Sequence, residues 1–556
     1  PYLSRIRRND RLTLRLAAPL AAGEERTIVV AWTGRPAEAA EPGFFFDSYL
    51  DIPLVFTLSQ PWSARAWWPC KDVPDDKATF DLSFAVPPGH VAASNGRLVE
   101  SGPDTCRGLP RDRWHWRTGH PMAVYLASLA AYPYTTIEDT FLTAPGDTVP
   151  IVHYVFPTRE WVCRQDFSIT VPVLEFFSSI FGPYPFPDEK YGAALVDIGG
   201  GMEHQTLTSY GWHLATGTHQ YDWVFVHETA HQWFGDAVTC EDWTQIWLNE
   251  GFASYAEALW FEHLGGPAAL RDYMDAKDRP DRWNGPVLRV PDNPEPMYYF
   301  DAVVYDKAAW ILHMLRHVIG DEHFFGAIRD YAADPRYRYG TARTEDLQEI
   351  CEARYGHSLG WFFGPWLIRD DRMQVRWEWS QSLLAGEASL VLVVSQLQTP
   401  AYTMPIDCAI ETTAGARAER IWISSPSDTF TFSLDRPVID VRLDEDHFVL
   451  CDRIDGGATA ARAPAATALR GAFPNPCNPS TTIRFHLAEA GRADLRLYDV
   501  RGALVRTLVS GRLGAGAWGV PWDGRNDAGR PLAAGVYFCR LRAGGGEFVT
   551  KIVLAR

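Results

Sequence analysis

The sequence predicts a multidomain α+β fold, in which a β-rich first part is followed by a helical part and two smaller β parts. Three observations lead to this prediction. Apolar residues alternate with a period of two over the first 155 residues, take helical spacing from about residue 156, and return to short alternating runs from residue 372. The chain also has 556 residues, 46% of them hydrophobic, and this length is expected to hold three or four domains.

The first part, residues 1–155, is predicted to be a β-sheet domain. Alternating stretches at Arg11–Leu16, Thr27–Trp32 and Thr79–Val86 are separated by clusters of turn-forming residues, which is typical of strands in a sheet. The chain opens at Pro1 without a methionine, in what has the character of mid-domain sequence. We therefore expect the domain to be truncated at its start, and the chain to be a fragment or a processed form.

Five segments of residues 156–371 have the length and the apolar spacing of helices. They are Trp161–Phe181, Tyr221–Phe234, Gly251–His263, Val303–Ile319 and Thr344–Tyr355. Pro172 lies inside the first segment, so a kink or a split is expected at that residue.

The remaining residues return to short strands. Residues 372–452, with strands such as Ser389–Val394 and Ile421–Ile423, are predicted to form a small β-sandwich. A stretch rich in Ala, Thr and Pro has little to bury, which predicts a linker over residues 453–470. Residues 471–556 contain repeated turn signals and space for about seven short strands, which predicts a second compact β-sandwich.

Charge and composition exclude some classes of function. A net charge of −17 leaves no basic surplus to bind phosphates, so nucleic acid is not expected as a partner. No run of 18 apolar residues exists, so no transmembrane segment is expected. The nine cysteines are scattered without a Cys-x-x-Cys pair, which argues against a cysteine-based zinc site.

A metal-binding motif lies in the second predicted helix. His227 and His231 are four residues apart, so both imidazoles lie on one helix face and can reach one ion. Glu228 points to a different side, where a carboxylate can act as general base on a water activated by the metal. The His-Glu-x-x-His pattern alone occurs by chance in roughly one such chain in thirty. Glu250, inside Trp247–Gly251 and separated from His231 by 18 residues, supplies the expected third ligand.

Three further segments accompany this motif: Gln60–Phe80, Gly200–His204 and Val304–Lys307. With the metal motif, and in this order, they resemble the aminopeptidase N family of zinc peptidases, a gluzincin family that also includes leukotriene-A hydrolase. The resemblance covers roughly residues 1–450. It implies an N-terminal β saddle, a thermolysin-like catalytic domain over residues 156–371 and a small β-sandwich.

The resemblance also implies catalytic roles for matching residues. His227, His231 and Glu250 would bind one Zn²⁺ per chain, and Glu228 would be the general base. Tyr305 would donate its hydroxyl to the oxyanion of the tetrahedral intermediate, a role that suits a phenol.

Substrate-binding roles follow from the same resemblance. Glu203 would bind the free α-amino group of the substrate, and Gln60 would be a second ligand of that amine. The neighbouring residues expected to complete the substrate site are Gly200, Gly201, Met202 and His204. Asn249 and Asp236 are candidates for orienting the zinc ligands, although turn or cap residues would look the same.

The sequence departs from the family pattern at three points. His204 stands where the family usually has Asn, in a segment whose backbone is expected to pair with the substrate. Ala308 replaces the usual Gly after Tyr-x-Lys. The large C-terminal helical domain of many relatives is not found in the sequence, which predicts a more open site and argues against epoxide hydrolysis.

The last part has a resemblance of its own. Phe473–Ile483, Leu497–Gly502 and Gly535–Phe538 resemble the immunoglobulin-like domain related to that of the flagellar hook-capping protein. Such modules are common at the C-terminus of secreted bacterial proteins. The resemblance implies an exported protein (periplasmic, on the cell surface or secreted) whose module serves sorting, anchoring or spacing, and engages a secretion or surface-anchoring system. A disulfide between Cys477 and Cys539 is a hypothesis that suits an exported domain.

The function expected from the sequence is a zinc-dependent aminopeptidase that hydrolyses the N-terminal bond of peptides with a free N-terminus. Two alternatives stay open: a zinc endopeptidase, and a surface binding protein with an inactive peptidase core. The presence of Glu203 argues against the first. The intact set of His, Glu and Tyr residues argues against the second.

Overall fold

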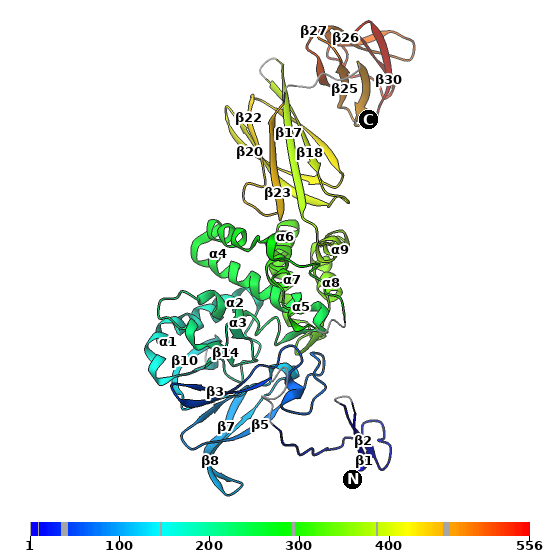
Figure 1. The fold of residues 1–556 in the computed structure, drawn as a ribbon. Coiled ribbons are helices and arrows are strands. Elements are labelled where there is room, and N and C mark those ends of the chain that lie inside the picture. Colours follow the sequence, from blue (N-terminus) through cyan, green and yellow to red (C-terminus); the bar gives the residue numbers. More distant parts are fainter. Residues whose placement is uncertain are drawn as a thin grey trace. The chain divides into compact units, whose positions relative to one another are not determined.

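The computed structural model describes residues 2–8, 11–34, 43–144, 147–291, 295–384, 387–459 and 467–555. They divide into two compact units, helices and strands of which are labelled in Figure 1. One unit consists of Pro1–His263, Leu288–Tyr305 and Phe325–Arg354, and the other of Leu264–Val287, Asp306–Phe324 and Tyr355–Arg556. Among the described residues, no helix combines the length and the apolar character that a membrane crossing needs.

The first unit begins with antiparallel β-structure, as the sequence predicts. A hairpin joins β1 to β2, a four-stranded sheet has the order β3-β4-β9-β6, and a three-stranded sheet has the order β5-β8-β7. The strands are β1 (Tyr2–Arg8), β2 (Arg11–Leu16), β3 (Phe44–Tyr49), β4 (Ile52–Thr57), β5 (Asp81–Val86), β6 (Val91–Ala93), β7 (Arg97–Cys106), β8 (Leu109–Arg117) and β9 (Ala130–Tyr132). The predicted strands at residues 11–16 and 79–86 are confirmed as β2 and β5.

The strand predicted at Thr27–Trp32 is wrong. These residues are irregular and mostly exposed, and Val29 is 86% exposed. An alternating pattern becomes a strand only when another strand pairs with it, and none in the described part of the chain pairs with this segment.

A five-stranded mixed sheet contains strands from both the β-rich part and the helical part of the chain. Its order is β10-β11-β12-β14-β13, with β12 parallel to both β11 and β14. The strands are β10 (Thr135–Ala144), β11 (Asp147–Val155), β12 (Ala193–Val196), β13 (Gly201–Met202) and β14 (Thr208–Gly211). The sheet therefore spans the boundary drawn at residue 155, because β11 pairs with β12 although residues 156–192, which include α1 and α2, lie between them.

Each predicted helical segment contains helix, with altered limits. The helices are α1 (Glu160–Asp166), α2 (Thr170–Phe181), α3 (Asp222–Ala230), α4 (Trp247–Lys277), α5 (Pro296–Tyr299), α6 (Ala308–Ile319), α7 (Asp321–Ala333), α8 (Thr344–Tyr355) and α9 (Gly360–Ile368). The split expected at Pro172 lies earlier, at a short 3₁₀ turn over Phe167–Ile169. Proline is tolerated in the first turn of α2 because no intrahelical N–H bond is needed there.

Several helical features have no clear sequence pattern. The helix α4 extends past the predicted end at His263 to Lys277, with non-helical angles at Gly266 (φ 73°, ψ −169°). Residues Val303–Lys307, expected to begin a helix, form a π-helical turn before α6. The helices α7 and α9 were not predicted, and α9 contains Pro365, which is unusual inside a helix.

The second unit contains a β-sandwich of two sheets. Their orders are β21-β18-β17-β23 and β20-β19-β22. The strands are β17 (Met373–Leu384), β18 (Glu387–Gln396), β19 (Met404–Thr412), β20 (Gly415–Ile423), β21 (Ser427–Leu434), β22 (Val438–Leu443) and β23 (Cys451–Ala458). The predicted linker at 453–470 is therefore too long at its start, because β23 pairs in parallel with β17 as far as Ala458.

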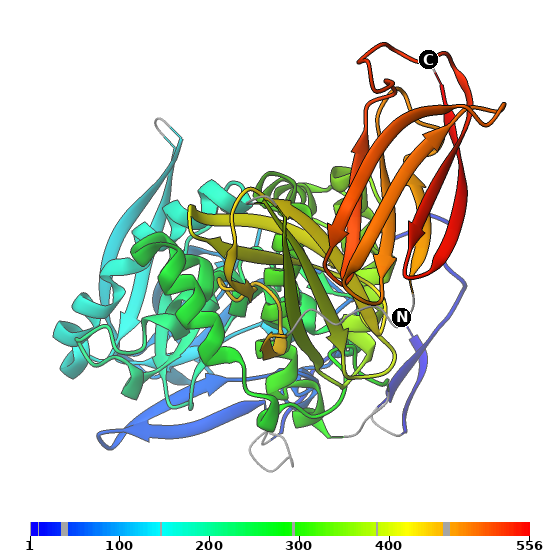
Figure 2. The same ribbon diagram turned by 90° about the horizontal axis from the view of Figure 1, so that it is seen from above.

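The C-terminal module is a second sandwich, seen from above in Figure 2. One sheet has the order β24-β25-β28 and the other β27-β26-β29-β30, and both contribute to one buried core. The strands are β24 (Ala468–Phe473), β25 (Thr481–Leu487), β26 (Gly491–Tyr498), β27 (Leu504–Leu513), β28 (Gly516–Trp522), β29 (Gly535–Ala543) and β30 (Gly546–Leu554). Since β24 begins at Ala468, the predicted linker is also too long at its end.

The disulfide hypothesised between Cys477 and Cys539 is not formed. Both residues are fully buried in the core of the module, and both are free thiols. They act as small apolar side chains of that core, a common role of unpaired cysteines.

Candidate active site

His227 of α3 and His231, the residue that caps the C-terminal end of this helix, converge on one point. The helix is buried along residues 224–230, where Val224, Phe225 and Val226 pack into the core. This burial fixes the helix face from which His227 and His231 project. Their Nε2 atoms are 3.1 Å apart.

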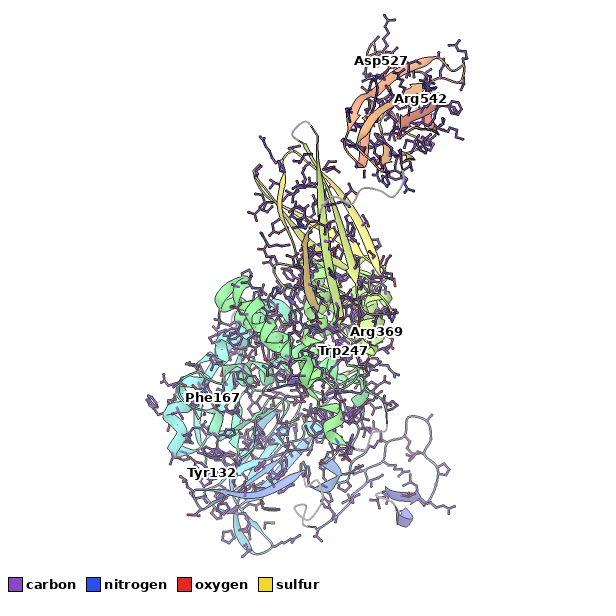
Figure 3. All side chains as sticks on the ribbon, turned by 45° about the horizontal axis from the view of Figure 1, so that its top comes forward. Tyr132, Phe167, Trp247, Arg369, Asp527 and Arg542 are labelled. Atoms are coloured by element: carbon purple, nitrogen blue, oxygen red, sulfur yellow. The ribbon has the colours of Figure 1, made fainter. Side chains whose placement is uncertain are left out.

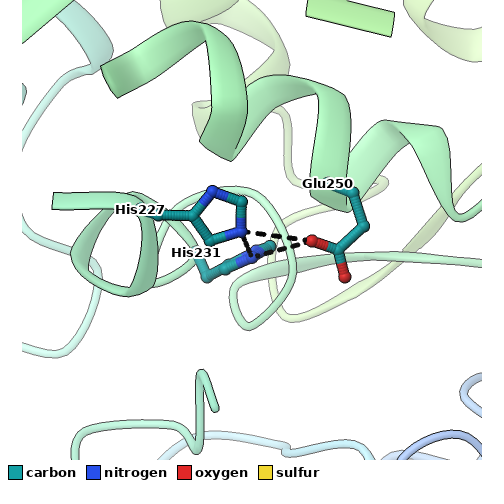
Figure 4. A group of neighbouring side chains, drawn as sticks. All are labelled: His227, His231 and Glu250. Carbon is teal, nitrogen blue, oxygen red and sulfur yellow. Dashed lines mark hydrogen bonds and ion pairs between the residues drawn. The ribbon is translucent and has the colours of Figure 1, made fainter. Parts of the chain in front are cut away.

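Glu250 completes the group from the first turn of α4, next to the fully buried Trp247 labelled in Figure 3. Its Oε2 atom lies 3.3 Å from the Nε2 atom of His227 and 3.3 Å from that of His231 (Figure 4). Two ligand atoms bound to one tetrahedral ion at 2.0–2.1 Å are about 3.3–3.4 Å apart. The three atoms therefore have the types and the spacing of a metal site.

The second nitrogen of each imidazole is also engaged. The Nδ1 atom of His227 lies 2.6 Å from Oε1 of Glu257, and that of His231 lies 2.9 Å from the main-chain oxygen of Phe234. These contacts fix the ring orientation and turn Nε2 towards the ion, as outer partners of metal ligands do.

The residues expected from the sequence to orient the ligands have other partners. Asn249 accepts a hydrogen bond from the N–H of Cys240, and Asp236 accepts one from the side chain of Gln232. Sequence reasoning missed Glu257. Its signal was the spacing of seven residues from Glu250, which places both carboxylates on one face of α4.

The histidines and carboxylates of this group shift one another's pKa values. Burial lowers the pKa of His227, but hydrogen bonds to Glu250 and Glu257 outweigh burial and raise it to about 10. Burial opposes ionisation of Glu250, yet the two histidines bring its pKa down to about 2. The geometry thus favours one anionic oxygen facing two imidazoles.

Glu228 lies beside this group and is only 6% exposed. Burial raises its pKa to about 8; the two histidines lower it, and Glu203 and Glu250 raise it. The strand β13 packs directly against it. A Cβ atom at Gly201 would lie 2.4 Å from Oε1 of Glu228, so only glycine leaves room for this carboxylate.

The predicted substrate segment forms the edge of the five-stranded sheet. Gly201 and Met202 pair on one side with Tyr210 and Ser209 of β14, and β13 is the last strand on that side. The carbonyl of Gly200 accepts a hydrogen bond from the N–H of Gly211. An edge strand of this kind has main-chain groups available for an extended peptide.

His204 does not fit the expected substrate contact. Its side chain is fully buried, with Nδ1 2.9 Å from the hydroxyl of Ser209. Its N–H donates to the carbonyl of Met202, and its own carbonyl accepts from Leu207. Both main-chain groups are used inside a tight turn, so β13 ends before this residue.

Glu203 is buried and faces the metal ligands. One ligand atom each from Glu203, Glu228 and His231 lies within 4.8 Å of the others. Gln60 donates to Oε1 of Glu203 through Nε2 at 2.9 Å, and Tyr125 donates to the same oxygen at 3.3 Å. The structure therefore brings Gln60 to the predicted amine site and adds Tyr125, which has no sequence motif.

Tyr305 reaches the site from the π-helical turn. Its ring centroid lies 6.0 Å from that of His227, with an interplanar angle of 28°. Burial raises the pKa of Tyr305 well above its ordinary value, and the carboxylates of Glu250 and Glu203 raise it further. The hydroxyl therefore keeps its proton and remains a hydrogen-bond donor.

Two lysines, the half-buried Lys77 and the buried Lys190, hold the loops around the site. Lys77 donates to the carbonyl of Asp236 at 2.8 Å, just after the metal-binding helix. Lys190 donates to the carbonyl of Thr206 at 3.0 Å, in the loop that carries Glu203. Burial lowers the pKa of each lysine to about 7.

The domains of the chain match known families. Residues 165–366 match the peptidase family M1 domain, residues 5–126 match the peptidase M1 N-terminal domain, and residues 479–547 match the FlgD Ig-like domain. The fold and the arrangement of the two histidines and Glu250 agree with these matches. The chain belongs to the M1 peptidases, the aminopeptidase N family, and carries an FlgD-type immunoglobulin-like module at its C-terminal end.

Individual relatives agree with this assignment. The chain is 31% identical over 365 residues to human endoplasmic reticulum aminopeptidase 1, covering 61% of this chain and 37% of the relative. It is 27% identical over 351 residues to aminopeptidase N of Streptomyces lividans, covering 58% and 39%. The chain therefore spans less than two fifths of the length of these curated relatives.

A solved structure has the same fold over much of the chain. The crystal structure of Legionella pneumophila aminopeptidase A in complex with aspartic acid aligns with a TM-score of 0.65 at 20% identity. The alignment covers 74% of this chain and 48% of that one.

Proposed function

We propose that this chain is a zinc-dependent aminopeptidase that hydrolyses the first peptide bond of peptides with a free N-terminus. One observation carries the proposal: the carboxylate of Glu203 lies within 4.8 Å of ligand atoms of Glu228 and His231. An ammonium group bound by Glu203 would place the first peptide bond of a substrate beside the metal ligands.

Zinc fits the donor set of two imidazoles and one carboxylate, with the open fourth position of catalytic sites. Bound there by His227, His231 and Glu250, it would supply a Lewis acid that polarises the peptide carbonyl and makes water more acidic.

The chain's own residues perform the remaining steps. Glu228 removes a proton from the attacking water and returns it to the nitrogen of the leaving amine. Tyr305 donates its hydroxyl to the developing oxyanion, a contribution of about 3–4 kcal/mol for a single well-placed donor. Both side chains stand around the point on which the metal ligands converge.

The amine subsite accounts for specificity. Gln60 and Tyr125 hold Oε1 of Glu203, so this carboxylate has a fixed position in which to meet the substrate ammonium. A peptide extended along the free edge of β13 would place only its first residue between Glu203 and the metal ligands. Internal peptide bonds lack the ammonium that Glu203 needs as a partner.

The first test is hydrolysis of a panel of unblocked aminoacyl amides that release a fluorophore. We expect activity that a zinc chelator abolishes and zinc restores. The endopeptidase alternative is tested with an N-acetylated peptide, which an aminopeptidase must leave intact. Cleavage of the blocked peptide would contradict the proposal, as would a folded, zinc-loaded chain that cleaves none of the unblocked substrates.

We also propose that the protein is exported from the cell that produces it, and that its C-terminal module engages a secretion or surface-anchoring system. The resemblance of this module to domains of secreted bacterial proteins supports the proposal. Fractionation of producing cells tests it: most of the protein should lie outside the cytoplasm, and a chain that stays in the cytoplasm would contradict export.

A further inference from the structure

The C-terminal module differs in charge from the rest of the chain. Residues 471–556 contain 12 Lys and Arg against 6 Asp and Glu, a surplus of six positive charges, whereas the whole chain has a net charge of −17. The preceding 470 residues therefore have a net charge of −23. The module is therefore basic, while the rest of the chain is acidic.

Much of the surplus lies on one face of the module. In the sheet β27-β26-β29-β30, alternate side chains such as Leu495, Leu497 and Leu541 are buried in the core. The intervening positions form the outer face of this sheet. Its basic residues are Arg492, Arg496, Arg512, Arg540, Arg542 and Lys551, and Arg542 is labelled in Figure 3.

The strand register places like charges opposite each other on this outer face. Arg492 pairs with Arg512 across β26 and β27, and Arg496 pairs with Arg540 across β26 and β29. Like charges directly opposite in a sheet destabilise it. Such pairs suggest that the face serves an interaction rather than the stability of the module.

Two carboxylates on the outer face neutralise only part of this charge. Asp494 lies 3.5 Å from Arg492 and 3.1 Å from Arg496. Glu547 pairs with Arg542 and lies 3.9 Å from Arg540. Six cations against two anions leave a surplus of four on this described face.

The outer face also has aromatic and hydroxyl groups. Tyr498 is directly opposite Phe538 in the register, and Phe538 is 38% exposed. The guanidinium of Arg540 lies 4.4 Å from the ring centroid of Tyr498. Ser510 is exposed and donates to Asp494.

We propose that this outer face binds an anionic polysaccharide. Guanidinium groups bind carboxylate, sulfate or phosphate substituents through paired N–H bonds. Asp494, Glu547 and Ser510 can accept hydrogen bonds from sugar hydroxyls, and the exposed ring of Phe538 provides apolar surface for a sugar ring. The guanidinium groups, the hydrogen-bond acceptors and the aromatic ring of this face thus match the anionic substituents, the hydroxyls and the sugar rings of such a polymer.

Two other polyanions fit less well. A nucleic acid has densely spaced phosphates, which the net charge of −23 on the rest of the chain repels. A lipid bilayer requires apolar side chains that insert. The exposed large apolar side chains described on this face are Leu504, Phe538 and Val549, which lie on three different strands, and two carboxylates lie among its cations.

The test measures binding of the full chain to immobilised polygalacturonate and dextran sulfate, with neutral dextran as the blank. The test variant is Arg512→Glu with Lys551→Glu, two exposed residues of the face. The matched control is Arg484→Glu with Arg530→Glu, two exposed arginines elsewhere in the module, which changes the net charge by the same amount. We expect the wild type to bind and the test variant to bind about tenfold or more weakly, while the control stays within about twofold.

Four outcomes would overturn the proposal. They are no binding of the wild type to either charged polymer, equal weakening in test and control variants, tighter binding to phosphatidylglycerol vesicles or duplex DNA than to both polysaccharides, and self-association of the chain that the test variant abolishes. Should the double glutamate variant fail to fold, Arg512→Gln with Lys551→Gln gives the same comparison at lower charge change.

Discussion

Charged side chains near the metal ligands are buried and paired, whereas those on the outer face of the C-terminal module are exposed or half-buried, with cations in surplus. Glu203, Glu250 and Glu257 are each at most 3% exposed, and each has a hydrogen-bonding partner. In the module, four arginines share two carboxylates. Burying a charge costs free energy unless its partners are in place, while an exposed charge costs little. We therefore expect substitutions near the metal ligands to change the rate of hydrolysis, and substitutions on the outer face of the module to change only the binding of its partner.

The largest effect is expected from Glu228→Gln. The amide keeps the shape of the side chain but cannot accept a proton, so kcat should fall by about 10²–10⁴-fold. The substitution also replaces a buried ionisable group with a neutral amide, so the thermal unfolding midpoint should stay the same or rise. Steady-state kinetics and thermal unfolding of the zinc-loaded protein measure both. A midpoint that falls along with kcat would indicate a structural role for this carboxylate.

Gly201→Ala should reduce kcat by about 10- to 100-fold, because displacement of a catalytic group by about 1 Å has an effect of this size. The added Cβ would lie 2.4 Å from Glu228, so the carboxylate or β13 must move. The matched control is Gly199→Ala, whose Cβ would have nothing within 4 Å. Equal kcat values for the two variants would show that the contact between β13 and Glu228 does not position the base.

Glu257→Gln should weaken zinc binding by about 10- to 100-fold, which is typical for loss of an outer partner of a metal ligand. An amide is a poorer acceptor for the Nδ1–H of His227 than a carboxylate. Competition with a chromogenic chelator measures the affinity. Activity at saturating zinc should recover largely, and an unchanged affinity would argue against the role assigned to Glu257.

The smallest effect concerns the pH dependence of stability. Burial lowers the pKa of Lys190 to about 7 from an ordinary value of 10.5. Between these two pH values the unfolded chain binds more protons than the folded chain, so this lysine makes stability rise with pH. Lys190→Met should reduce that rise. The measurement is the midpoint of the thermal transition that abolishes activity, taken from pH 7 to pH 10, and an identical slope in wild type and variant would contradict it.

The sequence predicted the fold most reliably where the pattern was local and long. The helix at Thr344–Tyr355 and the strand at Arg11–Leu16 have the limits that were predicted. The predicted strand at Thr27–Trp32 failed because pairing, not alternation, makes a strand. The boundary at residue 155 fell inside a sheet because β11 and β12 are far apart in sequence and adjacent only in the fold.

By itself the sequence determined the metal-binding motif and the residues around it. The spacing of His227 and His231 fixes their common helix face, and four residues of helix require no tertiary information. Glu203 and Tyr305 were found through short motifs whose residues are close in sequence. Chemistry that depends on residue type and local spacing can be predicted in this way.

Only the tertiary structure determined which groups support that chemistry. Gln60 and Tyr125 meet Glu203 across 143 and 78 residues, and Gly201 meets Glu228 across two different elements. The opposed arginines of the outer face likewise depend on strand register. Contacts of this kind arise when separate elements pack together, and packing is set by the whole core rather than by any one segment.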